Sequence, residues 1–135
     1  MPPRYFTPEE ANAALADVRP LAEKLVEHRR TLERAERERA ELAVRIAGNG
    51  GGIDTSKLQL LEKRIERARV GIARCVNGIH GVGAIVKDLD QGLVDFPARH
   101  EDDDVLLCWR VGEAKVEFWH GLEEGFAGRK PLPFE

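Results

Sequence analysis

The nine residues GIHGVGAIV, which span residues 78–86, decide the fold, because the spacing of apolar side chains changes within them. Before Gly78, apolar residues recur every three or four positions, as they do along one face of a helix. After Gly83 they alternate with polar residues, as in a strand that buries one face. This change predicts an α+β domain in which helices come first and an antiparallel sheet follows.

Two helices are predicted before residue 81. The apolar stripe of the first comprises Val18, Leu21, Leu25, His28, Leu32, Ala35, Arg39, Leu42 and Ile46, and that of the second comprises Leu58, Leu61, Ile65, Ala68, Ile72, Cys75 and Ile79. A glycine-rich run, residues 48–52, separates the two stripes. The pattern therefore predicts a long antiparallel helical hairpin over residues 8–80.

The expected helix ends carry recognisable signals. Thr7 and Glu10 have the spacing of a capping box, so the first helix should begin beside Thr7. Pro20 cannot donate a backbone hydrogen bond, so we expect a kink or a break near Val18 to Pro20. Asp54 or Ser56 is expected to cap the second helix.

Two positions of the first stripe, His28 and Arg39, are polar, and they allow two interpretations. Both side chains could lie at the edge of the helix contact and reach water. Alternatively, the hairpin of a second chain docks here and forms a four-helix homodimer, since polar residues in such stripes set the number of partners. The second interpretation predicts a homo-oligomer that forms through the helical hairpin.

Residues 81–135 should form a small antiparallel sheet of three to four strands and a C-terminal tail. Residues 84–89 and 93–96 are predicted strands around a turn, and Pro97 should end the second strand or make it an edge. Residues 105–111 and 114–119 are predicted to form a hairpin about Gly112 and Glu113. That register places Val105 opposite His120. It assigns Val105, Leu107, Trp109, Val116 and Phe118 to the core face, with Leu106, Cys108, Arg110 and Trp119 on the other face.

Candidate ligand-binding residues gather in the sheet region: Lys87, Asp95, Arg110, Glu113, His120 and Arg129. Asp95 lies between two apolar residues of a strand, so its carboxylate needs a partner if it is buried. Arg110 is the expected partner, because a guanidinium can give a carboxylate two hydrogen bonds. This pair could simply stabilise the sheet, or Arg110 and Arg129 could hold a small anionic ligand.

Metal binding and catalysis find less support in the sequence. Asp95, Cys108, His120 and Glu123 could form a mixed metal site, although a histidine at a strand end more often bonds a carbonyl. Cys108 could act as a nucleophile only if a base lowered its pKa. The sequence contains no GxSxG, HExxH, P-loop or paired CxxC motif, so neither an enzyme activity nor a cofactor follows from it.

Composition narrows the function classes. A net charge of −3 and a pI of about 5.9 argue against a dedicated nucleic-acid-binding protein, and glutamates are interspersed among the arginines of the helices. No run approaches the roughly 18 apolar residues of a membrane span. Because the chain has two cysteines, too few for a disulfide framework, we expect free thiols and a cytoplasmic location.

The chain also resembles a family of small prokaryotic proteins known as a domain of unknown function. The resemblance covers nearly the whole chain and rests on these motifs: Arg4 to Thr7, Glu9 to Asn12, Lys87-Asp88, Gly92 to Pro97, Cys108 to Arg110, Gly112-Glu113, Trp119-His120, Gly125-Phe126, Gly128-Arg129 and Pro131-Leu132. It implies a cytoplasmic bacterial protein and no particular activity.

These observations predict one domain over residues 1–135 that is a non-enzymatic ligand- or partner-binding or assembly module. The alternative is a small enzyme or metal-binding protein whose site lies around Asp95, Cys108, Arg110 and His120.

Overall fold

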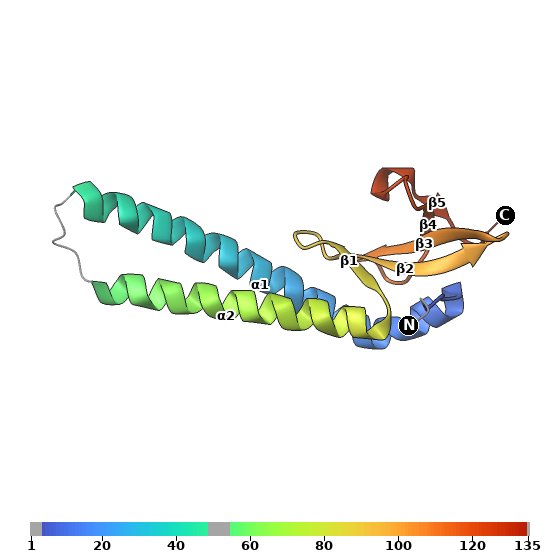
Figure 1. Ribbon diagram of the computed structural model, residues 1–135, viewed down its shortest axis with the longest axis horizontal. Coiled ribbons are helices and arrows are strands. Elements are labelled where there is room, and N and C mark those ends of the chain that lie inside the picture. The colour runs from blue at the N-terminus through green and yellow to red at the C-terminus, as the bar shows by residue number, and fades with distance from the viewer. Residues whose placement is uncertain (1–3, 49–54, 135) are drawn as a thin grey trace.

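The computed structural model describes residues 4–48 and 55–134 and shows an α+β fold of two long helices followed by one antiparallel sheet (Figure 1). Helix α1 (Pro8–Gly48) and helix α2 (Thr55–Val82) pair along their length. The hairpin extends away from the sheet, so only its base packs against the strands (Figure 1).

Helix α1 begins where the capping box predicts. The Glu10 amide donates to Thr7 Oγ1 at 3.1 Å, and the Thr7 amide donates to Glu10 Oε1 at 3.0 Å. These hydrogen bonds hold the pKa of Glu10 below its usual range. The helix continues through Pro20, so the break considered there does not occur. Of the two proposed caps of α2, Ser56 lies within its first turn, and Asp54 lies outside the described residues, as does most of the glycine-rich run.

The residues of the apolar stripes predicted for the helices are buried or half-buried in the structure, and they contribute to two hydrophobic cores. The distal core is made by the helices alone and contains Leu32, Ala35, Leu42, Leu61, Ile65 and Ala68. The proximal core joins both helices to one face of the sheet through Leu15, Val18, Leu25, Ile79, Phe96, Leu107 and Trp109, among others. The sheet is therefore fixed to the base of the hairpin by a continuous apolar contact.

The sheet has five strands in the order β1-β2-β3-β4-β5, so the prediction of three to four strands was too low. The strands are β1 (Ile85–Asp88), β2 (Leu93–His100), β3 (Asp103–Arg110), β4 (Phe118–Gly121) and β5 (Lys130–Pro131), and a short 3₁₀ helix, η1 (Phe126–Gly128), precedes the last. Strand β5 was missed because it has only two residues and lies within a tail rich in proline and glycine.

Strand β2 does not end at Pro97. Instead, Pro97 lies at an edge of the strand, which was the other outcome predicted for this residue. The strand continues to His100, while β1 pairs only with Leu93 to Asp95. Beyond the end of β1, the Pro97 carbonyl accepts a hydrogen bond from the Phe6 amide at 2.7 Å. Pro97 therefore sits where that side of β2 is a local edge, which suits a residue without an N–H.

The register predicted for the β3–β4 hairpin is wrong by one residue. Leu106, not Val105, lies opposite His120, and Leu107 lies opposite Trp119. A shift of one residue moves a strand's side chains to the other face of the sheet. Trp119 consequently packs against the proximal core. Phe118 lies on the other face of the sheet, where its cross-strand partner is Cys108.

No helix in the described residues is long and apolar enough to cross a membrane.

Candidate functional site

Three buried polar side chains, those of Asp95, Cys108 and His120, lie together on the outer face of the sheet, which is the face that points away from the helices. Their exposed fractions are 2%, 0% and 3%. Their neighbours along the strands, such as Val94 and Trp109, belong to the proximal core, and side chains alternate between the two faces of a sheet. We call these three residues the buried triad.

Three adjacent strands bring the buried triad together. Asp95 of β2 lies directly opposite Cys108 of β3. His120 of β4 lies opposite Leu106, which is two residues from Cys108 and therefore on the same face. One potential ligand atom from each residue of the triad lies within 4.8 Å of those of the other two. Predicting the convergence of these three residues required the correct strand order and register.

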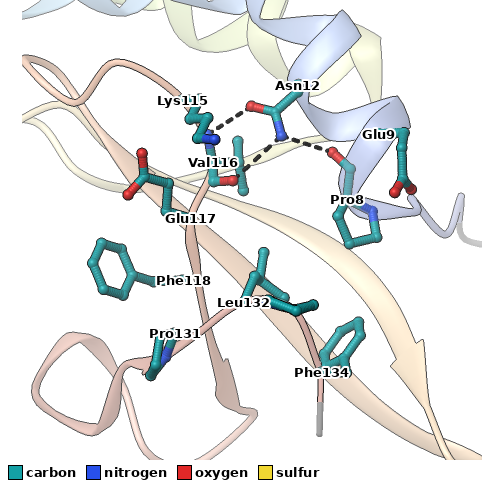
Figure 2. Close-up of a pocket in the computed structure, with 11 residues that line it drawn as sticks. Pro8, Glu9, Asn12, Lys115, Val116, Glu117, Phe118, Pro131, Leu132 and Phe134 are labelled. Carbon is teal, nitrogen blue, oxygen red and sulfur yellow. Dashed lines mark hydrogen bonds between the residues drawn. The ribbon is translucent and has the colours of Figure 1, made fainter.

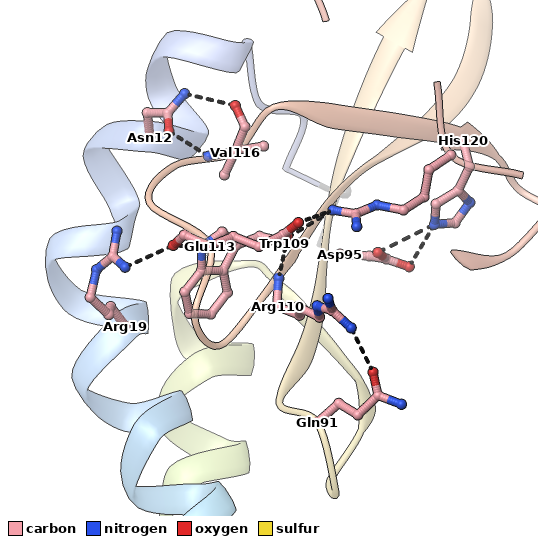
Figure 3. Close-up of polar contacts among 10 residues, drawn as sticks. Asn12, Arg19, Gln91, Asp95, Trp109, Arg110, Glu113, Val116 and His120 are labelled. Atoms are coloured by element: carbon pink, nitrogen blue, oxygen red, sulfur yellow. Dashed lines mark hydrogen bonds and ion pairs between the residues drawn. The ribbon is translucent and has the colours of Figure 1, made fainter. Parts of the chain in front are cut away.

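Hydrogen bonds fix the orientation of the His120 ring (Figure 3). Its Nδ1 lies 2.8 Å from the Gly121 carbonyl oxygen, and because a carbonyl can only accept, Nδ1 carries a proton. The other ring nitrogen, Nε2, lies 3.3 Å from each carboxylate oxygen of Asp95. The predicted partner of Asp95 was Arg110, and that prediction is corrected here: the partner is His120.

Burial controls the protonation of the other two members of the triad. It raises the pKa of the Asp95 carboxyl, while the neighbouring His120 opposes the shift. Burial, together with the nearby Asp95 carboxylate, raises the pKa of the Cys108 thiol to about 12. A thiol with so high a pKa stays protonated at neutral pH and is a poor nucleophile. The arrangement thus raises the thiol pKa, where a catalytic cysteine requires it lowered.

This high thiol pKa predicts how stability depends on alkaline pH. Above a pH of about 8.5, the unfolded chain loses the Cys108 proton while the native protein keeps it. The free energy of unfolding therefore falls by about 1.4 kcal/mol per pH unit. In urea titrations, the stability gap between the wild type and Cys108→Ala should narrow by about 2 kcal/mol from pH 8 to pH 10. Leu106→Ala, which truncates a buried neighbour without a proton, is the control and should show a constant gap. A constant gap for Cys108→Ala as well would contradict the raised pKa.

A second polar group lies beside the buried triad. Arg129 donates from Nη2 to both carboxylate oxygens of Glu113, at 2.7 and 2.8 Å, and its guanidinium covers the Phe118 ring at 4.0 Å. Glu113 also accepts the Arg110 amide at 2.9 Å. The Arg129 charge lies close enough to Cys108 to oppose the rise in its pKa. Glu113 and Arg129 were both predicted as site residues, and the structure pairs them with each other.

The remaining predicted site residues lie at the edge of this group. Arg110 is exposed and donates to Gln91 Oε1 at 3.2 Å (Figure 3). Its guanidinium also lies 5.3 Å from the centroid of the Phe126 ring. Lys87 is exposed where β1 departs from regular pairing, near enough to Asp95 to favour its ionised form. Glu123, weighed as a metal ligand, is exposed and is not part of the triad.

Two residues that the sequence analysis did not select, Asn12 and Arg19, anchor the loop before β4. Asn12 accepts the Val116 amide at 2.7 Å and donates to its carbonyl at 3.3 Å (Figure 2). Arg19 donates to the carbonyls of Glu113 and Ala114, at 3.0 and 2.6 Å. Asn12 is the last residue of the motif Glu9 to Asn12, and its place in that motif was the one sequence feature that could have pointed to it. Nothing in the sequence distinguishes Arg19 from the other arginines of the helix.

Two surface grooves lie apart from the buried triad. One, of about 640 Å³, separates the start of α1 from the C-terminal segment and is lined by apolar residues that include Val116, Phe118, Leu132 and Phe134 (Figure 2). The other, which we call the hairpin groove, also measures about 640 Å³ and lies between the helices. Its lining is Leu21, Lys24, His28, Glu66, Arg67, Val70, Gly71, Arg74 and Cys75. The polar stripe residue His28 therefore contributes to a groove.

Comparisons with known proteins identify a family but no activity. Neither the curated proteins nor the solved structures include a match to this chain. A family model described as "Uncharacterized conserved protein (DUF2203)" matches residues 4–132, which is nearly the whole chain and agrees with the resemblance noted from its motifs. The chain belongs to this uncharacterised conserved family, DUF2203.

Proposed function

We propose that this protein is a non-enzymatic assembly module, in which two copies pair through the hairpin groove. The observation that carries the proposal is the complementary charge of this groove and of an exposed acidic segment in the sheet region of the same chain. We call the apolar lining residues, which include Leu21 and the 42% exposed Val70, the floor of the groove. Its charged lining residues, which we call the rim, are the basic Lys24, Arg67 and Arg74 and the acidic Glu66.

Charge is distributed unevenly between the two parts of the molecule. Helix α2 carries six Lys or Arg and two Glu, hence a net charge of +4. Residues 85–134 carry six Lys or Arg and eleven Asp or Glu, hence a net charge of −5. Since the hairpin extends away from the sheet, most of α2 does not contact the acidic region of its own chain (Figure 1). An antiparallel pair of chains would bring the opposite charges together.

The segment of the second copy that would occupy the groove is residues 121–126. Leu122 is 60% exposed and Phe126 is 36% exposed, and the exposed Glu123 lies between them. Glu124 shapes this segment by accepting the Gly121 amide at 2.8 Å. Leu122 would reach the apolar floor, and Glu123 would face the basic rim. In a two-fold dimer this contact forms twice, because each chain provides one groove and one segment.

A charge exchange tests the proposed dimer. In sedimentation equilibrium, the wild type should self-associate at micromolar concentration. Arg67→Glu should raise the dissociation constant at least about tenfold, a loss of about 1.4 kcal/mol. Combining it with Glu123→Arg should recover most of the affinity, because the two charges have exchanged places.

Lys57→Glu provides the matched control, since it makes the same charge change on an exposed residue of α2 outside the groove, and it should leave the dissociation constant unchanged. A wild-type protein that stays monomeric at high micromolar concentration would overturn the proposal. So would a dimer that Lys57→Glu and Arg67→Glu weaken equally.

The other functional predictions remain part of this proposal. The exposed Arg110, which forms no ion pair among the described residues, supports the binding of a small anionic ligand at the edge of the outer face. The protonated Cys108 thiol supports a non-enzymatic function over a thiol-based enzyme.

Two free cysteines support a location in the bacterial cytoplasm. The acidic sheet region argues against nucleic acid as the partner, because the phosphate backbone is negatively charged.

A further inference from the structure

We propose that the buried triad, Asp95, Cys108 and His120, is a binding site for a single divalent transition-metal ion, with Zn²⁺ as its best chemical match. The inference is independent of the proposed dimer, because the triad lies on the sheet and not in the hairpin groove. It provides a carboxylate oxygen, a thiolate sulfur and an imidazole nitrogen. This combination of hard and soft donors is typical of zinc and unsuited to Ca²⁺ or Mg²⁺, which prefer oxygen alone.

The His120 ring is already in the orientation that a metal ligand needs. Histidines that bind metals nearly always donate their second ring N–H to a carbonyl or a carboxylate. Here Nδ1 makes that bond to the Gly121 carbonyl at 2.8 Å, and this leaves Nε2 to face Asp95 and act as the ligand atom. Gly121 lies at the end of β4, so the backbone of the sheet fixes the ring orientation.

The spacing of the donor atoms agrees with a tetrahedral ion. Nε2 lies 3.3 Å from both oxygens of Asp95, which is long for a charge-assisted hydrogen bond of about 2.7–2.9 Å. Around a tetrahedral zinc with bonds of about 2.0–2.1 Å, nitrogen and oxygen ligands lie about 3.3 Å apart. The sulfur lies within 4.8 Å of the other two ligand atoms, and around a tetrahedral zinc it would lie about 3.5 Å from each of them.

Charge balance also favours an ion at this position. An ionised Asp95, a thiolate Cys108 and a neutral His120 together carry two negative charges, which a divalent ion neutralises. A neutral buried group avoids the large cost of burying an uncompensated charge. In a zinc site the bound ion replaces the thiol proton, and proton release therefore accompanies binding.

Three ligands leave the fourth tetrahedral position to water or another small ligand. In the described part of the chain, the triad is the one group of at least three His, Cys, Asp or Glu residues whose ligand atoms converge in this way. Arg129 lies near the thiol and is held by Glu113, with its Nε unpartnered. Its charge would favour an anionic ligand at the open position.

Cobalt substitution tests the site in the full chain without an affinity tag. Co²⁺ added to metal-free protein should bind with a stoichiometry of one per chain, and a tetrahedral cobalt thiolate should show a thiolate-to-cobalt charge-transfer band and visible d–d bands. Excess Zn²⁺ should displace the cobalt and raise the melting temperature. Cys108→Ser should abolish the charge-transfer band, and Asp95→Asn should weaken Co²⁺ binding at least about 100-fold.

Cys75→Ser is the control, because it removes the other buried thiol, which lies in the helical hairpin, and it should leave the band unchanged. Circular dichroism establishes that each variant is folded. If Cys108→Ser does not fold, the question is decided on Cys75→Ser, whose only thiol is that of Cys108. Bound Zn²⁺ should then protect this thiol from an alkylating reagent. A wild type without the stoichiometric band, or a band that Cys75→Ser removes, would overturn the site.

Discussion

Replacing His120 by alanine should destabilise the protein by about 3–5 kcal/mol at pH 8, measured by urea denaturation. Removal of the side chain that pairs with a buried carboxylate leaves the carboxylate charge uncompensated, and this costs far more than a lost surface contact. Asp95 is 2% exposed, and His120 is the partner that holds its carboxylate at 3.3 Å. His120 is itself 3% exposed, so both members of the pair are buried.

The stability lost in His120→Ala should be smaller in acid, because the Asp95 carboxyl takes up a proton there. Burial already raises the pKa of Asp95, and without His120 nothing opposes that rise as strongly. A carboxyl whose folded pKa exceeds its unfolded pKa, about 3.9, contributes its full stability below that value and loses it as the pH rises. His120→Ala should therefore be less destabilising at pH 5 than at pH 8.

His80→Ala is the matched control, because His80 is exposed and its ring only accepts the Val86 amide at 3.3 Å. Its cost should stay below about 1 kcal/mol at either pH. A loss for His120→Ala that is the same at pH 5 and pH 8 would mean that a cavity, not an unpaired carboxylate, causes the destabilisation.

The need of Asp95 for a partner could be predicted from the sequence, but the partner could not. An acidic residue between Val94 and Phe96 requires compensation wherever the strand is buried. The choice between Arg110 and His120 depends on which residues share a face, and this depends on strand register. A register wrong by one residue placed His120 opposite Val105 and on the opposite face from Cys108.

The register error has an identifiable physical origin in the connection between β3 and β4. Gly112 and Glu113 resemble a two-residue turn, but residues 111–117 separate the two strands. Side chains of α1 hold that connection: Asn12 binds the Val116 backbone, and Arg19 binds two carbonyls. These contacts join residues more than 90 positions apart, and local sequence patterns do not report them.

The helical hairpin was predictable because its determinants are local. The capping box and the apolar period involve residues three or four positions apart, and both predictions agree with the structure. The convergence of Asp95, Cys108 and His120 depends instead on three strands paired in the correct order. The residue types of a metal site can therefore be noted in a sequence, while their geometry needs the fold.

Gly92→Ala should destabilise the protein by about 2–4 kcal/mol, because two costs add at this turn between β1 and β2. The φ angle of Gly92 is +65°, which costs a non-glycine residue about 1 kcal/mol. An added Cβ would also lie 2.5 Å from Val111 Cγ2 and 2.8 Å from Val26 Cγ2. Both contacts are too close, and overpacking of this kind costs about 1–3 kcal/mol.

Two other glycines separate these costs in the same urea assay. Gly112 has a φ of +102° but nothing within 4 Å of an added Cβ, so Gly112→Ala should cost only the backbone part, about 1 kcal/mol. Gly81 lies in α2 with open space around it, and Gly81→Ala should be neutral or stabilising by up to about 1 kcal/mol. If Gly92→Ala cost no more than Gly112→Ala, the packing of α1 against the β1–β2 turn through Val26 would be looser than the structure shows. That turn leads directly into the strand that carries Asp95, so the same result would also weaken the case for a rigid, preorganised triad.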